Sequence, residues 1–376
     1  MQIKNGLVLN ENFEFEKTSI EFSDKINSFG KEDMDENVFD AEGLYVVPGL
    51  VDTHIHASLG ETFIDFTETT AEKVCSFQAK NGTTSILPTL SAAREEKMIN
   101  AVKYITDKAK TLPGNCAKIQ GLHLEGPFFA QKYKGAHLPE NIRIPTVAEF
   151  DRLYDASCGA VKIITMAPEL ENGIEVVKHA HKCGVKVSVG HSDADFETAM
   201  LAFSSGASRS THTFNAMSPL NHRKPGVVGA AMSDKNVTCE LICDFFHVHP
   251  SVVKLLFDIK GSDKITAVTD AEVGTGMKDG EYLVNGRMLK VEDGKTYTED
   301  GTIAGGTSVL LDGVKNLVSI GISLENAVKC ASFNGAKAAC LENSIGSLKV
   351  GKCADILVLD KNLDVVKVFV DGKSVL

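Results

Sequence analysis

The order of hydrophobic and polar positions divides the chain into two strand-rich ends and a central stretch of another kind. Residues 1–46 contain short runs in which apolar and polar residues alternate, such as QIKNGLVLN and NFEFEK, a pattern typical of half-buried sheet. Residues 347–376 show β-branched runs separated by Gly-Lys and Asp-Gly turns. We expect the two ends to pair into one small β-sandwich, formed by residues 1–47 and 347–376.

The central stretch, residues 48–346, predicts a barrel of parallel strands. Short β-branched runs alternate there with helical patterns, several of which end on glycine as C-caps do. The strand candidates are LVDTHIH, TSILPTL, KIQGLHLE, AVKIITMAPE, KVSVGHS, SRSTHTF, VTCELICD and KITAVTD. They predict an α/β fold with a (β/α)8 TIM barrel, whose active site lies at the carboxyl ends of the strands. Asp-Gly and Asn-Gly turns near residues 280–300 predict an inserted hairpin.

Composition narrows the class of protein. The 376 residues exceed the usual size of one simple core, and 43% hydrophobic with 24% charged residues is typical of a globular protein. The net charge of −11 argues against a nucleic-acid partner, because no basic stripe is present to neutralise phosphates. A small anionic substrate needs only a local basic pocket.

The cysteines and the first residues indicate the compartment. The 9 cysteines are scattered without a CxxC pair, which fits reduced thiols in a cytoplasmic protein. The N-terminus carries acids where a signal peptide needs a basic start, and no window approaches the ~18 apolar residues of a membrane span. We expect a cytoplasmic protein that does not bind membranes.

Imidazole and carboxylate groups fall at the ends of the predicted strands. They are His54 and His56 on the first strand, Glu125 on the third, His191 on the fifth, His212 on the sixth and Asp270 on the eighth. Alternate residues of a strand point to the same side, so the first two histidines can share one ion. A single HxH pair also fits two polar side chains that close a strand, but six such groups at one barrel mouth favour a divalent metal site.

Other candidates have simpler interpretations. His179 and His181 lie on a predicted helix, where a spacing of two points the side chains to different faces, so we expect surface residues. His123 points inward one layer below Glu125 and is expected in the core, and His249 is expected to cap a helix. Lys162 lies five residues before the Ala-Pro end of its strand, which favours barrel-floor packing over a carbamylated metal bridge.

Longer strings carry a family resemblance over nearly the whole chain. They are VVPGLVDTHIH, GLHLEGPFF, KGAH, TMAPE, GHSDAD, THTFNAMSPL, HRKPGVVGAA, HVHP, VTDA and GTIAGG, of which HLEGPF and HTFNAM are far more specific than HxH. The chain resembles the amidohydrolase superfamily, and within it the deacetylases of amino sugar phosphates. The resemblance implies a metal-dependent homodimer that hydrolyses N-acetyl-D-glucosamine 6-phosphate to glucosamine 6-phosphate and acetate.

The same resemblance assigns roles to individual residues. Metal ligands fall on Glu125, His191 and His212, with His54 and His56 holding a second ion where one is present and Asp270 beside them as the catalytic aspartate. Substrate contacts fall on His137, Asn215, Ala216, Arg223, His247 and Ile303. A guanidinium suits phosphate and exposed backbone N–H groups bind anions, although Arg223 also fits a solvated loop arginine.

The implied chemistry is amide hydrolysis assisted by one or two divalent ions. Nitrogen and oxygen ligands without thiolate suit Zn²⁺ and also Fe²⁺, Mn²⁺ or Co²⁺. Asp270 is expected to take a proton from water and return it to the leaving amine, while His137 stabilises the oxyanion. Ala57 and Phe245 replace residues that are commonly glycine in the family, which bears on which sugar fits. Alternatives are a deacetylase of N-acetylgalactosamine 6-phosphate, another amidohydrolase, and a non-catalytic barrel.

Overall fold

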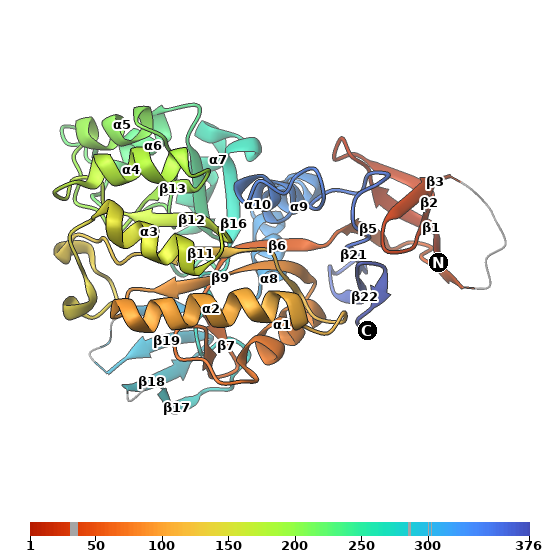
Figure 1. Cartoon of the computed structure of the whole chain (residues 1–376). Coiled ribbons are helices and arrows are strands. Elements are labelled where there is room, and N and C mark those ends of the chain that lie inside the picture. Colours follow the sequence, from red (N-terminus) through yellow and green to blue (C-terminus); the bar gives the residue numbers. More distant parts are fainter. Residues whose placement is uncertain (31–36, 285–286, 300, 302) are drawn as a thin grey trace.

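A barrel of parallel strands forms the centre of the computed structural model, which describes residues 1–30, 37–284, 287–299, 301 and 303–376 (Figure 1). The strands follow one another around the barrel as β6 (Leu50–Ile55), β9 (Thr83–Ser91), β11 (Leu122–Glu125), β12 (Val161–Met166), β13 (Lys186–Val189), β14 (Ala207–Ser210), β15 (Thr238–Ile242) and β16 (Ile265–Val268), with β10 (Lys118–Ile119) beside β9. Each of the eight predicted strand segments contributes its strand in sequence order, which confirms the predicted barrel.

The barrel closes at the carboxyl ends of its first and last strands. Ile55 forms a parallel bridge with Ala271, and the backbone N–H of Asp270 donates to the carbonyl of His54 over 2.9 Å. The closing contacts therefore lie beside the predicted ligands. A short antiparallel pair, β7 (Ala57–Ser58) and β8 (Glu61–Thr62), follows β6 at this end.

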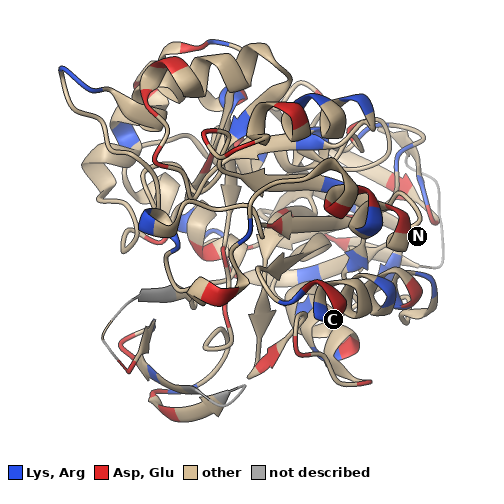
Figure 2. Ribbon diagram, turned by 60° about the vertical axis from the view of Figure 1, so that its left-hand side comes forward, with Lys and Arg blue, Asp and Glu red and all other residues tan. Residues whose placement is uncertain are grey.

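Amphipathic helices cover the outside of the barrel. In α4 (Gly173–Lys182) the buried residues are Gly173, Val176, Val177 and Ala180, so one stripe faces the strands. The other helices are α1 (Thr70–Lys80), α2 (Glu95–Thr111), α3 (Val147–Ala156), α5 (Phe196–Ser204), α6 (Gly226–Ser233), α7 (Pro250–Lys260), α8 (Leu310–Ser319), α9 (Leu324–Ala331) and α10 (Phe333–Ala338). Lys and Arg segments are interspersed with Asp and Glu segments along them (Figure 2). In the described part of the chain, none of the helices is long and apolar enough to cross a membrane.

Both ends of the chain contribute to a second sheet beside the barrel (Figure 1). The strands follow one another in the order β23 (Lys373–Ser374), β22 (Val365–Val370), β21 (Ile356–Leu359), β5 (Tyr45–Pro48), β1 (Gln2–Leu9), β2 (Phe15–Phe22) and β3 (Ile26–Phe29), with β4 (Val38–Asp40) paired to β1. Phe22 of β2 contacts Phe369 of β22, with ring centroids 5.1 Å apart, although these strands are not neighbours in the sheet. The sheet therefore folds over its own apolar core. The domain limits at residues 47 and 347 stay a prediction.

The insertion after β16 is larger than the predicted hairpin. It is an antiparallel sheet of four strands, β17 (Gly280–Val284), β18 (Arg287–Glu292), β19 (Lys295–Thr298) and β20 (Ile303–Gly306). The last strand returns to the barrel, where Gly306 bridges to Ala271. This return fixes the insertion beside the closing strands.

Candidate active site

The six predicted ligand residues converge at the carboxyl end of the barrel. Glu125 lies at their centre: its Oε1 is 3.3 Å from Nε2 of His54, 3.2 Å from Nε2 of His191 and 3.1 Å from Nε2 of His212. The other oxygen, Oε2, is 3.3 Å from Nε2 of His56. Residues that lie between 66 and 87 positions from Glu125 in the sequence thus meet around its carboxylate.

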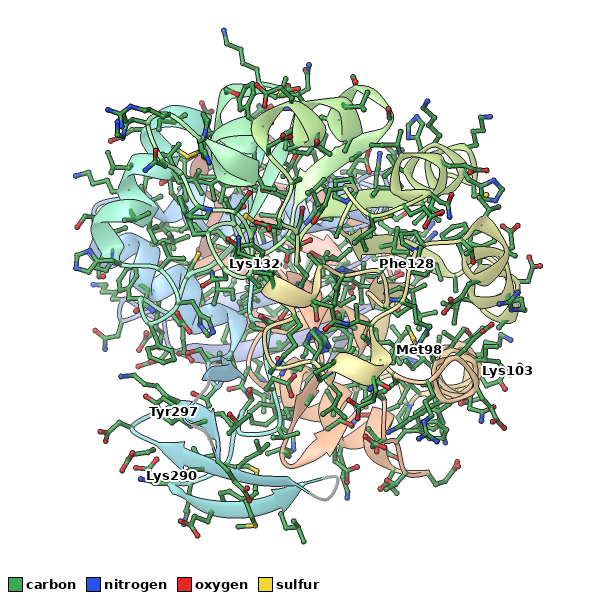
Figure 3. All side chains as sticks on the ribbon, turned by 90° about the vertical axis from the view of Figure 1, so that its left-hand side faces the viewer. Met98, Lys103, Phe128, Lys132, Lys290 and Tyr297 are labelled. Carbon is green, nitrogen blue, oxygen red and sulfur yellow. The ribbon has the colours of Figure 1, made fainter. Side chains whose placement is uncertain are left out.

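Asp270 completes the cluster from the eighth strand. Its Oδ1 is 3.3 Å from Nε2 of both His54 and His56. The cluster lies in a cavity of ≈ 420 Å³ that is also lined by the predicted substrate residues His137, Asn215, Ala216 and His247. Figure 3 looks toward the side of the molecule that carries Lys132 and Tyr297, which lie in the loop after β11 and in the inserted sheet.

The backbone at three ligand residues adopts a conformation that L-amino acids rarely use. His191, His212 and Asp270 have φ angles of 49°, 27° and 49°, and each lies two residues after the end of its strand. Residues held in this region cost about 1–3 kcal/mol each and cluster at functional sites. Gly190, before His191, is required by close packing, because a Cβ there would lie 2.7 Å from the side chain of Thr211.

The far nitrogens of the rings have different partners. Nδ1 of His54 is 2.6 Å from Glu240, Nδ1 of His56 is 3.0 Å from the Ser91 hydroxyl, and Nδ1 of His191 is 2.8 Å from the carbonyl oxygen of Tyr133. Nδ1 of His212 has no hydrogen-bond partner among the described residues. In each of the first three rings, Nε2 therefore points at the cluster.

Burial and the neighbouring carboxylates together set the protonation of these rings. Burial opposes a charge on His56, but hydrogen bonds to Asp270 and Glu125 outweigh it and raise its pKa to about 10. Burial dominates at His191 and lowers its pKa to about 4. At Asp270 burial is outweighed by the charge of His54, which holds the pKa of this carboxyl well below its ordinary value. Asp270 is therefore an ionised acceptor at neutral pH.

The donor atoms fit divalent cations. Two groups of three ligands are formed, His54 with His56 and Glu125, and Glu125 with His191 and His212, and the atoms of each lie within 4.8 Å of one another. Ligand atoms bound to one tetrahedral Zn²⁺ at ~2.0–2.1 Å lie about 3.3 Å apart. The spacings of 3.0 Å between Nε2 of His191 and Nε2 of His212 and of 3.1 Å to Glu125 are close to this value. Glu125 belongs to both groups and would be shared.

Metal binding is expected to release protons. A ligating imidazole must be neutral, whereas the pKa of about 10 at His56 keeps that ring protonated at neutral pH in the metal-free protein. We expect the apparent affinity for Zn²⁺ to rise with pH by about tenfold per unit for each proton released. Calorimetric titration in buffers of different ionisation enthalpy measures the proton count, and a heat independent of the buffer would contradict this prediction.

Comparison with known proteins gives the family. Residues 45–375 match the model of the Amidohydrolase family, which spans nearly the whole chain. The chain belongs to the amidohydrolase family. This amidohydrolase is 33% identical to an N-acetylgalactosamine-6-phosphate deacetylase of Escherichia coli O157:H7 over 90% of this chain and 89% of that protein. It is 34% identical to an N-acetylglucosamine-6-phosphate deacetylase of Bacillus subtilis over 85% and 82%.

A solved structure extends the comparison from the sequence to the fold. A mutant N-acetyl-D-glucosamine-6-phosphate deacetylase from Mycobacterium smegmatis, in complex with N-acetyl-D-glucosamine-6-phosphate, superposes with a TM-score of 0.93 and 30% identity. The alignment covers 100% of this chain and 99% of the other. The whole fold of this amidohydrolase, insertion and second sheet included, is therefore similar to that of a deacetylase with its sugar phosphate bound.

One predicted substrate residue lies outside the cavity, and another has no described side chain. Arg223 is exposed and lines a separate depression of ≈ 660 Å³ with Lys132 and Lys224. The backbone of Ile303 lies in β20, but its side chain is outside the described residues. Phe245 is a departure from the family pattern that the structure explains: its φ is 62°, as a glycine would have, and its ring packs against the core rather than among the described residues that line the cavity.

The remaining histidines and Lys162 mostly follow expectation. His123 is fully buried, with its nitrogens 3.0 Å from the Thr53 carbonyl oxygen and 2.8 Å from the Thr165 hydroxyl, and His249 caps α7 through Ser251. Lys162 lies at the start of β12, away from the cluster. His181 is exposed, and His179 is a partly exposed surface residue whose Nε2 lies 2.6 Å from Asp151.

Two buried acids near His54 were not predicted from the sequence. Glu240 is fully buried in β15 against His54, and Asp52 is fully buried with its carboxylate accepting from the Thr269 hydroxyl over 2.6 Å. Burial raises the pKa of Asp52 to about 7. The available signal was an acid within an apolar strand, in VTCELICD and in GLVDTHIH, because such an acid is buried only with a partner.

Proposed function

We propose that this chain hydrolyses the N-acetyl group of N-acetyl-D-glucosamine 6-phosphate and releases glucosamine 6-phosphate and acetate. The observation that carries the proposal is the convergence of Glu125, Asp270 and the histidines of three strands in one cavity of a chain aligned end to end with such a deacetylase. We further propose that it acts in the cytoplasm as a homodimer, in amino sugar breakdown and recycling.

Glu125, His191 and His212 would hold one divalent ion, and His54 and His56 with Glu125 a second, with Asp270 beside them. The nitrogen and oxygen donors suit Zn²⁺ best, with Fe²⁺, Mn²⁺ or Co²⁺ as alternatives. When bound, such an ion supplies Lewis acidity toward the amide carbonyl and the attacking water.

The chain's own residues would move the proton and stabilise charge. Asp270 is ionised and directed at the cluster, so it can take the proton of the attacking water and return it to the amine. Nε2 of His137 is 3.2 Å from Glu125 and the ring lines the cavity, where it can donate to the oxygen of the carbonyl as it becomes negative. His247, held by Asp244 at 2.7 Å, and the turn at Asn215 would contact the sugar.

The epimeric sugar is the second candidate. The relatives include one that is named for N-acetylgalactosamine 6-phosphate at 33% identity, against 34% for the Bacillus subtilis deacetylase. The deciding test measures steady-state acetate release from both sugar phosphates with the metal-loaded protein. A higher kcat/KM for the galactosamine compound would replace the proposed substrate, and no acetate from either would refute the proposed reaction.

Arg223 is proposed as a phosphate contact although it lines a depression separate from the cavity that holds the cluster. We expect Arg223→Ala to raise KM for the sugar phosphate by about 10-fold or more, as the loss of a charge-assisted bond of ~1.5–3 kcal/mol would. The matched comparison is the unphosphorylated N-acetyl sugar, for which the variant and the wild type should behave alike. Equal losses on both sugars would assign Arg223 a purely structural role.

A further inference from the structure

We propose that Glu240 is a positioning residue that orients His54 in the cation position formed by His54, His56 and Glu125. This inference rests on the metal sites of the proposed function. Glu240 lies in the middle of β15, where its side chain is fully buried inside the barrel. It does not belong to either group of ligands, so its carboxylate acts through the histidines that it contacts.

The contacts of Glu240 fix the direction of the His54 ring. Its Oε1 lies 2.6 Å from Nδ1 of His54. Because a carboxylate only accepts hydrogen bonds, the Nδ1 proton points at Glu240 and Nε2 is the ring nitrogen directed at the cluster. Nε2 is there 3.3 Å from Glu125 and 3.1 Å from Nε2 of His56. A carboxylate behind a ligating imidazole fixes the tautomer and makes the ring a stronger ligand.

The other rings of the cluster lack such a partner. His56 is held by the neutral hydroxyl of Ser91 and His191 by the carbonyl of Tyr133, while Nδ1 of His212 has no partner in the described part of the chain. Of these four imidazoles, His54 is the one with a carboxylate at Nδ1. The position that contains His54 should therefore depend most on Glu240.

The same carboxylate reaches the other cation position through the backbone. Oε1 of Glu240 accepts from the N–H of His212 over 3.1 Å, and the φ angle of His212 is 27°, a conformation that needs support from its surroundings. One buried side chain thus contacts a member of each ligand group. Its geometry couples the placement of the two groups.

Arg209 balances the buried charge. Its Nη2 is 3.2 Å from the other oxygen of Glu240, and both side chains are nearly inaccessible. Buried ion pairs of this kind are weak evidence for stability, because apolar residues of similar volume often stabilise a fold as well or better. Nε of Arg209 also has no partner among the described residues, so the ion pair leaves one buried donor unsatisfied. The hydrogen bond to His54 explains the position of Glu240 better than the ion pair does.

The test is a Co²⁺ titration of the metal-free full-length chain, with the wild type and Glu240→Gln compared. Gln keeps an oxygen for the backbone of His212 but removes the charge behind His54. We expect the wild type to bind about two ions, and the variant to bind the first ion unchanged and the second about 10- to 100-fold more weakly. Co²⁺ absorption measures each step, and magnetic coupling between paired ions reports when both positions are filled.

The control is Glu149→Gln, since Glu149 is another buried acid, paired at 2.7 Å with Arg143 and outside the cluster. It should lower thermal stability without changing either Co²⁺ affinity. Equal second-ion affinity in Glu240→Gln and the wild type, or a wild type that binds one ion, would overturn the proposal. If Glu240→Gln does not fold, Glu240→Asp retains the charge for Arg209 but is one methylene too short to keep the 2.6 Å contact with His54, and the same weakening of the second ion is expected. The titration uses no substrate, so a chain that binds two ions but releases no acetate would refute the proposed reaction and leave this inference standing.

Discussion

The variant Asp270→Asn is expected to keep its fold and its metal but to release acetate about a thousandfold more slowly, within the range of general acid–base catalysis. The amide has nearly the shape of the carboxylate but cannot accept the proton of the attacking water. The φ angle of Asp270 is 49°, a region that asparagine tolerates better than most residues, so the backbone should not be disturbed. The measurement is kcat, with metal content and circular dichroism recorded on the same sample.

Glu272→Gln is the matched control for this variant. Glu272 is another carboxyl that lines the cavity, two residues after Asp270, and burial raises its pKa to about 7. Its replacement removes an acid from the same cavity without removing the proposed proton acceptor, so we expect a far smaller loss of kcat. Near wild-type turnover in Asp270→Asn, or equal losses in both variants, would remove Asp270 from the proposed role.

The barrel could be predicted because its local patterns and its tertiary structure agree. The alternation of β-branched runs with helical patterns fixes eight βα units, and parallel strands bring their carboxyl ends to one face. The inserted sheet was underestimated because Asp-Gly and Asn-Gly turns show only neighbouring strands. The pairing of Gly306 with Ala271 joins the insertion to the closing strand, and no local signal carries such a contact.

The site was predictable where the alternation of side chains along one strand decides which residues share a face. It was not predictable where a contact joins residues of two different strands. The i, i+2 spacing of His54 and His56 sets both on one side of β6, and the same end of the barrel collects Glu125 and Asp270. The hold of Glu240 on His54 requires the distance between β15 and β6 across the barrel interior, which the linear order does not contain. The position of Arg223 depends on the conformation of its loop, which the linear order does not contain either.

The variant Glu125→Gln is expected to lose both cation positions at once. Its carboxylate contacts Nε2 of five imidazoles, including His137 at 3.2 Å, and it belongs to both ligand groups. An amide offers one weaker donor oxygen and no charge, so metal content should fall from about two ions to near zero. A Lewis acid contributes several kcal/mol to the transition state, and each ~1.4 kcal/mol is a factor of ten, so acetate release should fall about a thousandfold or more.

His54→Asn separates loss of one position from loss of both. His54 belongs only to the group that also contains His56, so this variant should retain the ion of Glu125, His191 and His212. Elemental analysis of the two purified variants, beside the wild type, gives the comparison directly. If Glu125→Gln retained as much metal as His54→Asn, the two groups would not share a carboxylate, and the ion held by His191 and His212 would have to depend on another acid at the barrel mouth, such as Asp270.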